Sequence, residues 1–372
     1  MRIAIVSDTF YPDPNGISTS LFHHLNYISK ENKTILFTVK KKNSPDSINE
    51  NVKLVYFKSF KFLRGGFDLA TPNTKLFARE FTNFKPDILH IHTPSPLGFL
   101  AISQAKKLRI PIVTTYHIIL AEQLGYLPIP RVRGSKRIKE LSWKYTLKFY
   151  NSTNLVIAPS KFVKTVLISN GVKTPIEIVS NGVDPKDFHK TLVKKYDIPT
   201  VLFVGRLGYE KNLEILIKSF KEINQNCRLL MIGEGTEYKK LKSLTNKLKL
   251  KDVIFKGFVK NDDLIDYYNK SHIFITPSKV ETEGIVILEA MMCGLPIICI
   301  NEGASKDLVK NNFNGLVVKN NVQEISNAIN LLLKNDYLRE KFGSNSIKIA
   351  KKYDIKLSIN KLEKIYKKFK KF

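Results

Sequence analysis

The sequence predicts an α/β protein built from two doubly wound parallel sheets. Short apolar segments of strand length alternate with amphipathic helical patterns along the chain, and the series starts afresh after a turn-forming cluster at residues 180–185. The length of 372 residues allows two domains at the usual size of about 150 residues each. A hydrophobic content of 43% is enough for two buried cores.

The first domain is expected over residues 1–179. Its predicted strands cover residues 3–7, 34–39, 52–57, 88–92, 112–116, 155–158 and 176–179. Apolar residues at helical spacing lie between several of these strands, and the first such helix follows a turn at residues 12–16. These alternations predict strand–helix–strand units, which place their strands parallel to one another.

The second domain is expected over residues 186–355. Its predicted strands cover residues 201–204, 229–232, 253–256, 273–276, 297–300 and 316–318. A Lys-rich helix over residues 358–372 follows, with Ser358 as its expected N-cap. Ligands of such sheets bind at the carboxyl ends of the strands, so the cleft between the two domains is the expected site.

The charge balance restricts the choice of partners. The chain has 61 Lys and Arg residues against 33 Asp and Glu residues, a formal net charge of +28. Such a surplus favours an anionic partner, namely nucleic acid, an anionic membrane surface or a phosphorylated substrate, unless it reflects compositional bias. The three cysteines lack metal-ligand spacing and fit core positions in a reducing compartment.

The start of the chain predicts a buried strand and not a signal peptide. No run approaches the ~18 apolar residues that a membrane span needs. We therefore expect a cytoplasmic protein.

Two glutamates, Glu281 and Glu289, stand eight positions apart in residues 277–294, with Gly284 between them. Glu281 falls in a strand-to-helix loop, and Glu289 falls about one turn into the following helix. Carboxylates accept hydrogen bonds from hydroxyl groups, and a helix N-terminus favours phosphate. A nucleotide sugar, which carries hydroxyls and phosphates together, suits this mixture.

A second motif follows the first strand of the second domain. Arg206 and Lys211 lie five positions apart at the strand exit. A planar guanidinium fork together with a lysine point charge forms a natural clamp for a diphosphate. This clamp could neutralise a nucleoside-diphosphate leaving group without a metal.

Two further residues of the first domain are weaker candidates. Gly16 lies in the turn after the first strand, where backbone N–H groups can approach a phosphate. His117 ends a predicted strand, where its imidazole could meet a sugar hydroxyl or an acceptor. We interpret His90 and His92 on the neighbouring strand as structural residues.

The glutamate pair and the clamp together resemble the retaining glycosyltransferases of family 4, which have the GT-B fold, and the resemblance covers essentially the whole chain. It implies that His117, Arg206, Lys211 and Glu281 are the catalytic residues. It also implies a donor-binding set of Gly16, Arg206, Lys211, Glu281, Gly284, Ile285 and Glu289. In this family the first glutamate lies by the donor sugar, and the second accepts hydrogen bonds from the ribose hydroxyls. The last helix commonly crosses back to the first domain.

The acidic motif departs from the usual family form. Glu283 occupies the position before Gly284 where an aromatic residue usually stands. This E-T-x-G variant is similar to the diacylglycerol glucosyltransferases. The resemblance thus implies transfer of a hexose, glucose or galactose, from UDP to diacylglycerol or a glycosyl-diacylglycerol. It implies retention of configuration, no metal and no further cofactor.

Two segments mix cations with aromatic residues, at residues 56–64 and 131–150, the second helical from about Ser135. Lys and Arg near an anionic leaflet contribute about 1 kcal/mol each, and aromatic residues add apolar insertion. For the 131–150 helix, a core-facing aromatic stripe with a solvated basic back is an equal alternative. The predicted membrane-binding residues are Phe57, Phe60, Phe62, Arg64, Arg131, Arg133, Lys136, Arg137 and Trp143.

Three alternatives remain. A family 4 enzyme with a soluble, polyprenyl or polysaccharide acceptor would share every donor residue. A nicotinamide-dependent oxidoreductase should show G-x-G-x-x-G after the first strand, and this chain does not. A nucleic-acid binder would explain the charge, but no nucleic-acid motif is recognisable. The leading prediction is a peripheral enzyme on the inner face of the cell membrane.

Overall fold

The computed structural model describes residues 1–11, 13, 16–62, 67–117 and 135–370. The chain divides into two compact units, and each is described by itself. The N-terminal unit comprises Met1–Asn181 together with Ile355–Phe372, and the C-terminal unit comprises Gly182–Asp354. Both units are α/β, and all thirteen predicted strands are present within one residue at each end, which confirms the predicted fold class.

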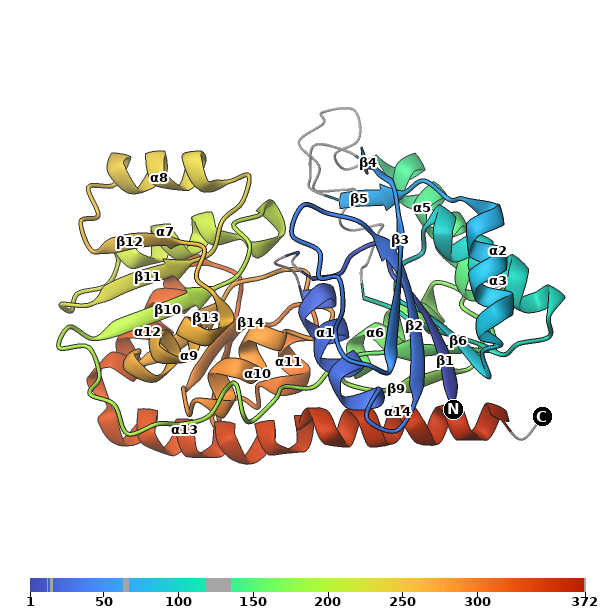
Figure 1. Ribbon diagram of the computed structural model, residues 1–372. Helices are drawn as coiled ribbons and strands as arrows, with labels where there is room; N and C mark the ends of the chain where they lie inside the picture. Colours follow the sequence, from blue (N-terminus) through green and yellow to red (C-terminus); the bar gives the residue numbers. More distant parts are fainter. Residues whose placement is uncertain (12, 14–15, 63–66, 118–134, 371–372) are drawn as a thin grey trace. The chain divides into compact units, whose positions relative to one another are not determined.

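The N-terminal unit contains a seven-stranded parallel sheet in the order β3-β2-β1-β6-β7-β8-β9 (Figure 1). Its strands are β1 (Arg2–Val6), β2 (Lys33–Val39), β3 (Val52–Phe57), β6 (Ile88–Ile91), β7 (Ile112–Thr115), β8 (Leu155–Ala158) and β9 (Ile176–Ile178). Its helices are α1 (Gly16–Ile28), α2 (Thr74–Phe84), α3 (Pro96–Lys107), α5 (Lys136–Tyr150), α6 (Lys161–Ser169) and α14 (Ile355–Lys370). The strand order reverses between β1 and β6.

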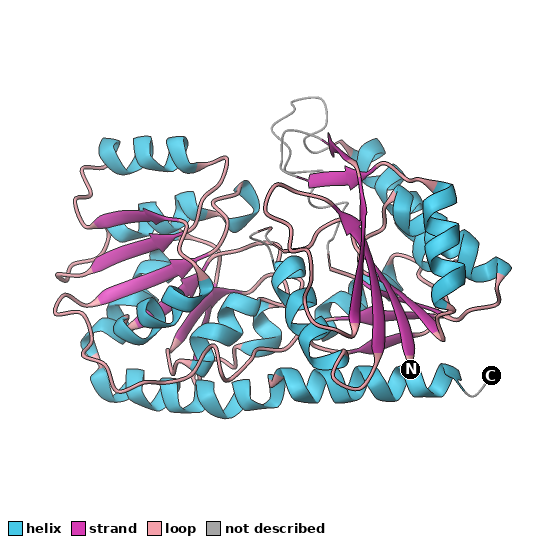
Figure 2. Cartoon of the chain, viewed as in Figure 1, coloured by secondary structure: helices cyan, strands magenta, loops and turns pink. Residues whose placement is uncertain are grey.

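The C-terminal unit contains a six-stranded parallel sheet in the order β12-β11-β10-β13-β14-β15. Figure 2 draws the strands in magenta and the helices in cyan. Its strands are β10 (Thr200–Val204), β11 (Arg228–Ile232), β12 (Val253–Gly257), β13 (Ile273–Thr276), β14 (Ile297–Ile300) and β15 (Gly315–Val318). Its helices are α7 (Leu213–Lys221), α8 (Tyr238–Lys247), α9 (Asn261–Lys270), α10 (Ile285–Met292), α11 (Ser305–Leu308), α12 (Val322–Lys334) and α13 (Asp336–Ala350), with short 3-10 turns at Tyr209–Lys211 and Lys351–Tyr353. The strand order reverses between β10 and β13.

The central strands β10, β13 and β14 of the C-terminal sheet are buried along their whole length, whereas the edge strand β12 is partly exposed. Neighbouring residues of one strand enter different cores: Val201 and Phe203 pack in one cluster, whereas Leu202 and Val204 pack in the other. Helices cover both faces, as expected for a doubly wound sheet. This arrangement leaves the carboxyl ends of the strands, and the loops that follow them, free to carry function.

The last helix, α14, is part of the N-terminal unit by its contacts. Ile359, Leu362 and Ile365 are buried in the same hydrophobic cluster as Ile3 and Leu25. The predicted start at Ser358 is wrong, because the helix begins at Ile355 and Ser358 is buried within it. Ile355 is itself buried and continues the apolar stripe by one turn, which moves the helix start toward the N-terminus.

The predicted loop at residues 56–64 is largely regular structure. Strand β3 runs to Phe57, and β4 (Ser59–Phe62) pairs antiparallel with β5 (Phe67–Ala70). The prediction that Phe57 contacts a membrane is wrong. Its side chain is only 2% exposed, with its ring centroid 6.4 Å from those of Phe37 and Phe77, because it falls on the inward face of β3.

Candidate functional site

The loop between β13 and α10 carries the predicted acidic motif in the C-terminal unit. Glu281 and Glu283 are both buried in this loop. Gly284 precedes α10 with a φ of +92°, a conformation that favours glycine. No side chain caps the first turn of α10, and the half-buried Ile285 begins it. The N–H groups of this turn can therefore serve a ligand.

The loop after β10 carries the predicted clamp. Arg206 Nη2 donates a hydrogen bond of 2.6 Å to Glu210 Oε1. Glu210 is buried, and its carboxylate occupies the space that a Cβ on residue 208 would need. Gly208 thus allows Glu210 to fold back beneath the guanidinium. The Arg206 side chain remains about half exposed, so its other N–H groups are available to a ligand.

The two loops meet at the carboxyl ends of the central strands β10 and β13 of the C-terminal sheet. Lys211 donates to Glu281 Oε1, which joins residues 70 positions apart in the chain. The backbone also links the loops, because Lys279 N donates to Glu210 O over 3.1 Å. Strands β10 and β13 are neighbours at the point where the strand order reverses, and ligands of open α/β sheets bind at this point. Arg206, Lys211 and Glu281 therefore lie in one place.

Glu289 lies deeper in the same unit. Its carboxylate is buried inside α10, and Tyr268 Oη donates a hydrogen bond of 2.7 Å to Oε2. Burial raises the pKa of Glu289 to about 7, although the hydrogen bond from Tyr268 acts in the opposite direction. Glu289 can therefore change its charge near neutral pH.

The predicted residues of the N-terminal unit lie on two of its elements. Gly16 is the exposed first residue of α1. His117 follows β7 at the carboxyl end of the sheet, and its Nε2 lies 2.9 Å from Nδ1 of His92, which follows β6. Burial lowers the pKa of His117 to about 3 and that of His92 well below its ordinary value. Both rings are neutral at physiological pH.

The predicted membrane-binding residues have mixed surroundings. Lys136 and Arg137 are exposed on α5, whereas Trp143 is half-buried. Phe60 is 48% exposed on β4. Arg64, Arg131 and Arg133 lie outside the described residues, as does the side chain of Phe62.

The buried face of α5 explains why its sequence pattern allowed two interpretations. Ser142, Thr146, Phe149 and Tyr150 form this face, so the aromatic residues at the end of the helix belong to the core. The exposed residues of the same helix include Leu141, at 62%. Across the described residues, none of the helices combines the length and the apolarity needed to cross a bilayer.

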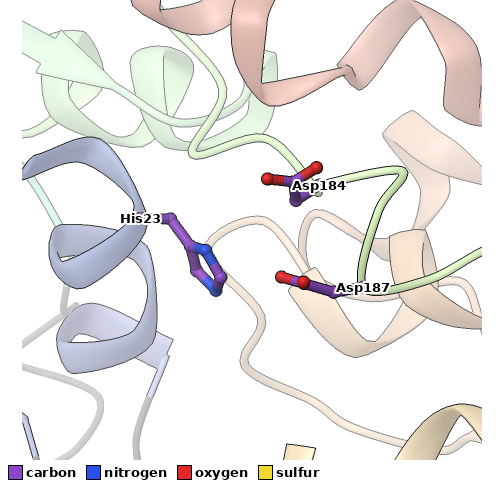
Figure 3. A group of neighbouring side chains, drawn as sticks. All are labelled: His23, Asp184 and Asp187. Carbon is purple, nitrogen blue, oxygen red and sulfur yellow. The ribbon is translucent and has the colours of Figure 1, made fainter. Parts of the chain in front are cut away.

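Three side chains that could offer metal ligands are drawn in Figure 3. His23 belongs to α1 of the N-terminal unit, whereas Asp184 and Asp187 belong to the C-terminal unit. Over the described residues, neither unit by itself brings three potential ligands from His, Cys, Asp or Glu together. The three cysteines are buried and free. A reaction without a bound metal stays a prediction.

Three residues that hold site residues in place were not predicted to do so from the sequence. Glu210 forms an ion pair with Arg206 four residues away, but residues 206–208 are loop and not helix, so the helical spacing rule for opposite charges did not apply. Tyr268 holds Glu289 across 21 residues, which no local pattern indicates. His92 contacts His117, and only the pairing of β6 with β7 brings the two rings together.

Two family models match the sequence of this chain, one in each half. Residues 14–187 match the family described as Glycosyltransferase Family 4, and residues 184–349 match Glycosyl transferases group 1. The sulfoquinovosyl transferase SQD2 of Arabidopsis thaliana is 29% identical over 76% of this chain, and the match spans 57% of that protein.

Two bacterial relatives share the name alpha-monoglucosyldiacylglycerol synthase. The Streptococcus pneumoniae protein is 26% identical over 80% of this chain and 70% of its own length. The Acholeplasma laidlawii protein is 26% identical over 89% of this chain and 88% of its own length.

Solved structures support the fold. A sucrose-phosphate synthase from Thermosynechococcus elongatus superposes with a TM-score of 0.83 at 19% identity, over 99% of this chain and 98% of that one. The Anabaena protein HepE, solved with UDP-glucose, superposes with a TM-score of 0.81 at 18% identity, over 99% of this chain and 100% of that one. The chain belongs to the glycosyltransferases that join a family 4 domain to a group 1 domain, and it has the GT-B fold.

Proposed function

We propose that this protein moves a hexose, glucose or galactose, from a nucleoside-diphosphate sugar to a membrane lipid, diacylglycerol or a glycosyl-diacylglycerol. The observation that carries the proposal is the pairing of Lys211 with Glu281 beside Arg206 and Glu210. This pairing presents cations for a diphosphate and carboxylates for sugar hydroxyls together, at the carboxyl ends of β10 and β13. The two bacterial relatives named as glycolipid synthases support the lipid acceptor.

On the donor side, Arg206 and Lys211 hold the diphosphate. Each cation has a carboxylate partner and is thereby oriented before a donor arrives. The exposed guanidinium of Arg206 offers a fork of N–H donors, and the Lys211 ammonium adds a point charge. The open first turn of α10 adds backbone N–H groups. Glu289 accepts hydrogen bonds from the ribose, the role that its counterpart has in the family.

The chemical step is a displacement with retention of configuration. The bond from the anomeric carbon to the diphosphate oxygen breaks, and its electron pair leaves with the diphosphate. The acceptor hydroxyl forms the new bond on the same face of the sugar, and its proton passes to the leaving phosphate. Arg206 and Lys211 stabilise the charge that develops on the diphosphate, so the step needs neither a metal nor a protein nucleophile.

The N-terminal unit supplies Gly16 and His117 in the roles that the resemblance implies. A neutral His117 can exchange one hydrogen bond with the donor sugar, and it does not act as a cation there. Gly16, at the exposed start of α1, leaves the backbone N–H groups of that turn accessible to the diphosphate.

The acceptor side uses the surface of α5 and β4. Exposed Lys136 and Arg137 attract anionic lipid, and Phe60 and Leu141 offer apolar side chains to the interface. We propose peripheral attachment to the inner face of the cell membrane, where cytoplasmic nucleotide sugars meet the lipid.

Donor identity can be tested by direct binding. Calorimetric titration with UDP-glucose, UDP-galactose and GDP-mannose should show one UDP-hexose binding most tightly. The same donor should bind at least ~10-fold more weakly to Lys211→Ala, because a charged hydrogen-bonding partner of the diphosphate is lost. Equal binding of the three donors, or unchanged binding in Lys211→Ala, would contradict the assigned donor site.

A further inference from the structure

A column of three histidines runs through the carboxyl end of the N-terminal sheet. We propose that His92 is a positioning residue, which fixes the ring orientation and the tautomer of His117 and leaves only Nδ1 of His117 for the donor sugar. The proposal rests on the proposed function, in which His117 contacts that sugar. It assigns a task to a residue that the sequence pattern marked as structural.

The contact between the two rings is direct. Nδ1 of His92 lies 2.9 Å from Nε2 of His117, within hydrogen-bonding distance. The rings are nearly parallel, at 17°, with centroids 5.2 Å apart. His92 follows β6 and His117 follows β7, so the pairing of these two strands holds the two backbones in register.

The charge state of the pair limits how it can bond. Burial lowers the pKa of His117 to about 3 and the pKa of His92 well below its ordinary value, so both rings are neutral at physiological pH. A neutral imidazole has one N–H donor and one acceptor nitrogen. Nδ1 of His92 and Nε2 of His117 therefore share a single proton, and one ring donates to the other.

The shared proton couples the two tautomers. If His117 donates from Nε2, its Nδ1 is an acceptor, and if His92 donates from Nδ1, the Nδ1 of His117 is a donor. In both cases Nε2 of His117 is hydrogen-bonded to His92. The ring nitrogen left for a ligand is Nδ1 of His117, and the tautomer of His92 decides whether this nitrogen donates or accepts a hydrogen bond.

A third histidine holds His92 in place. The His90 ring lies 4.2 Å from the His92 ring between centroids. Both nitrogens of His90 are hydrogen-bonded, Nε2 with Thr115 Oγ1 at 2.7 Å and Nδ1 with Tyr366 Oη at 2.6 Å. His90 therefore cannot rotate without losing two buried hydrogen bonds. Through Tyr366, the last helix α14 helps to hold the column.

A double-mutant cycle separates positioning from a merely structural role. His92→Phe keeps an aromatic ring against His90 and removes Nδ1, whereas His92→Asn keeps a polar group near the position of Nδ1. We expect His92→Phe to lower kcat/KM for the preferred nucleotide sugar about 10-fold, the size of one lost hydrogen bond. His92→Asn should restore most of this loss.

The cycle is completed in a His117→Ala background. If His92 acts through His117, His92→Phe should cause no further loss there. The proposal would be overturned if the losses of kcat/KM caused by His92→Phe and by His117→Ala multiply in the double variant. It would also be overturned if His92→Phe and His92→Asn lose kcat/KM equally.

A second readout does not need activity. In nitrogen-15 spectra of the full chain without donor, the His117 signals are identified by their absence from His117→Ala. We expect the His117 Nε2 signal to shift in His92→Phe and to stay near its wild-type position in His92→Asn. An unchanged signal in His92→Phe would overturn the positioning role. If the wild-type protein transfers no sugar, the proposed function fails and these spectra alone decide the role of His92.

Discussion

Tyr268 Oη donates a hydrogen bond of 2.7 Å to Oε2 of Glu289, and both side chains are buried in the C-terminal unit. The tyrosine comes from α9 and the glutamate from α10. Burial dominates the carboxyl group and raises its pKa to about 7. A carboxylate held in this way destabilises the apoprotein at neutral pH, as expected for a group kept for a ligand.

Replacing Glu289 by Gln should therefore stabilise the protein more at pH 8 than at pH 5. The folded-state pKa lies above the ordinary value of 4.5, so the folded state binds more protons than the unfolded state between these values. The wild type thus loses stability as the pH rises from about 4.5 to about 7, and Gln removes this dependence. Urea unfolding of both proteins at pH 5 and pH 8 measures the difference, and an equal difference at the two pH values would contradict the assignment.

The buried histidines of the N-terminal unit should make the protein more stable as the pH rises, opposite to the pH dependence that Glu289 causes. Burial lowers the pKa of His24 to about 4, and His90, His92 and His117 shift in the same direction. As the pH falls, the unfolded state binds protons at these histidines before the folded state does. The contribution of the neutral histidines to the free energy of unfolding is therefore fully present above pH 6.5 and is lost as the pH falls toward 4. The free energy of unfolding, measured from pH 7.5 to 5, should fall accordingly.

His24→Gln tests this histidine contribution. Gln can still donate to Asn181 O, the partner of His24 Nε2 at 2.8 Å, but it does not titrate. The variant should show a shallower loss of stability on acidification. The exposed His189 is the matched control, and His189→Gln should keep the wild-type dependence. Identical pH dependence in His24→Gln and wild type would contradict the account.

Lys211→Ala or Glu281→Gln should reduce turnover at least ~100-fold, a loss of about 2.7 kcal/mol of transition-state stabilisation. The reason is that each change removes one half of the Lys211–Glu281 ion pair, to which we assign contacts with the diphosphate and the sugar of the donor. Initial rates with saturating donor measure the effect, and circular dichroism checks the fold. Lys218→Ala, which removes an exposed cation from α7, is the control. Near-normal turnover in either site variant would reject the assignment.

Removal of three exposed cations from α5, in Lys136→Gln, Arg137→Gln and Lys144→Gln combined, should weaken binding to anionic vesicles at least ~10-fold. Each cation near such a surface contributes about 1 kcal/mol. Vesicle co-sedimentation at fixed ionic strength measures binding. The matched control removes Lys364, Lys367 and Lys370 from the exposed side of α14. Equal loss in the two variants would mean that net charge alone drives attachment.

The sheets were predictable from sequence because most of their central strands are short apolar runs that are buried along their whole length. The β10 segment Thr200–Val204 and the β14 segment Ile297–Ile300 are buried throughout, and each stands between turn-forming residues. The positions of Arg206 and Glu281 could also be predicted, because each lies in a loop that follows a buried strand, whereas their roles in donor binding stay a prediction. Local pattern and global fold agree at these places.

The missed features depend on contacts that are distant in the chain. Phe57 resembled an interfacial residue, and it is buried because α2 brings Phe77 over the same face of the sheet. The β4–β5 hairpin has only four residues in each strand, which is too short for the polar and apolar alternation of Ser59–Phe62 to identify a strand. The contact of His92 with His117 exists only through strand pairing, so neither residue alone indicates it.

The most direct test of the proposed function is product formation from radiolabelled UDP-glucose, UDP-galactose and GDP-mannose, with and without mixed micelles of diacylglycerol and anionic lipid. Label from one UDP-hexose should appear in a glycolipid only when diacylglycerol is present, with retained anomeric configuration. Transfer or donor hydrolysis that is indifferent to lipid would contradict the lipid acceptor, and would move the acceptor to a soluble or polysaccharide molecule.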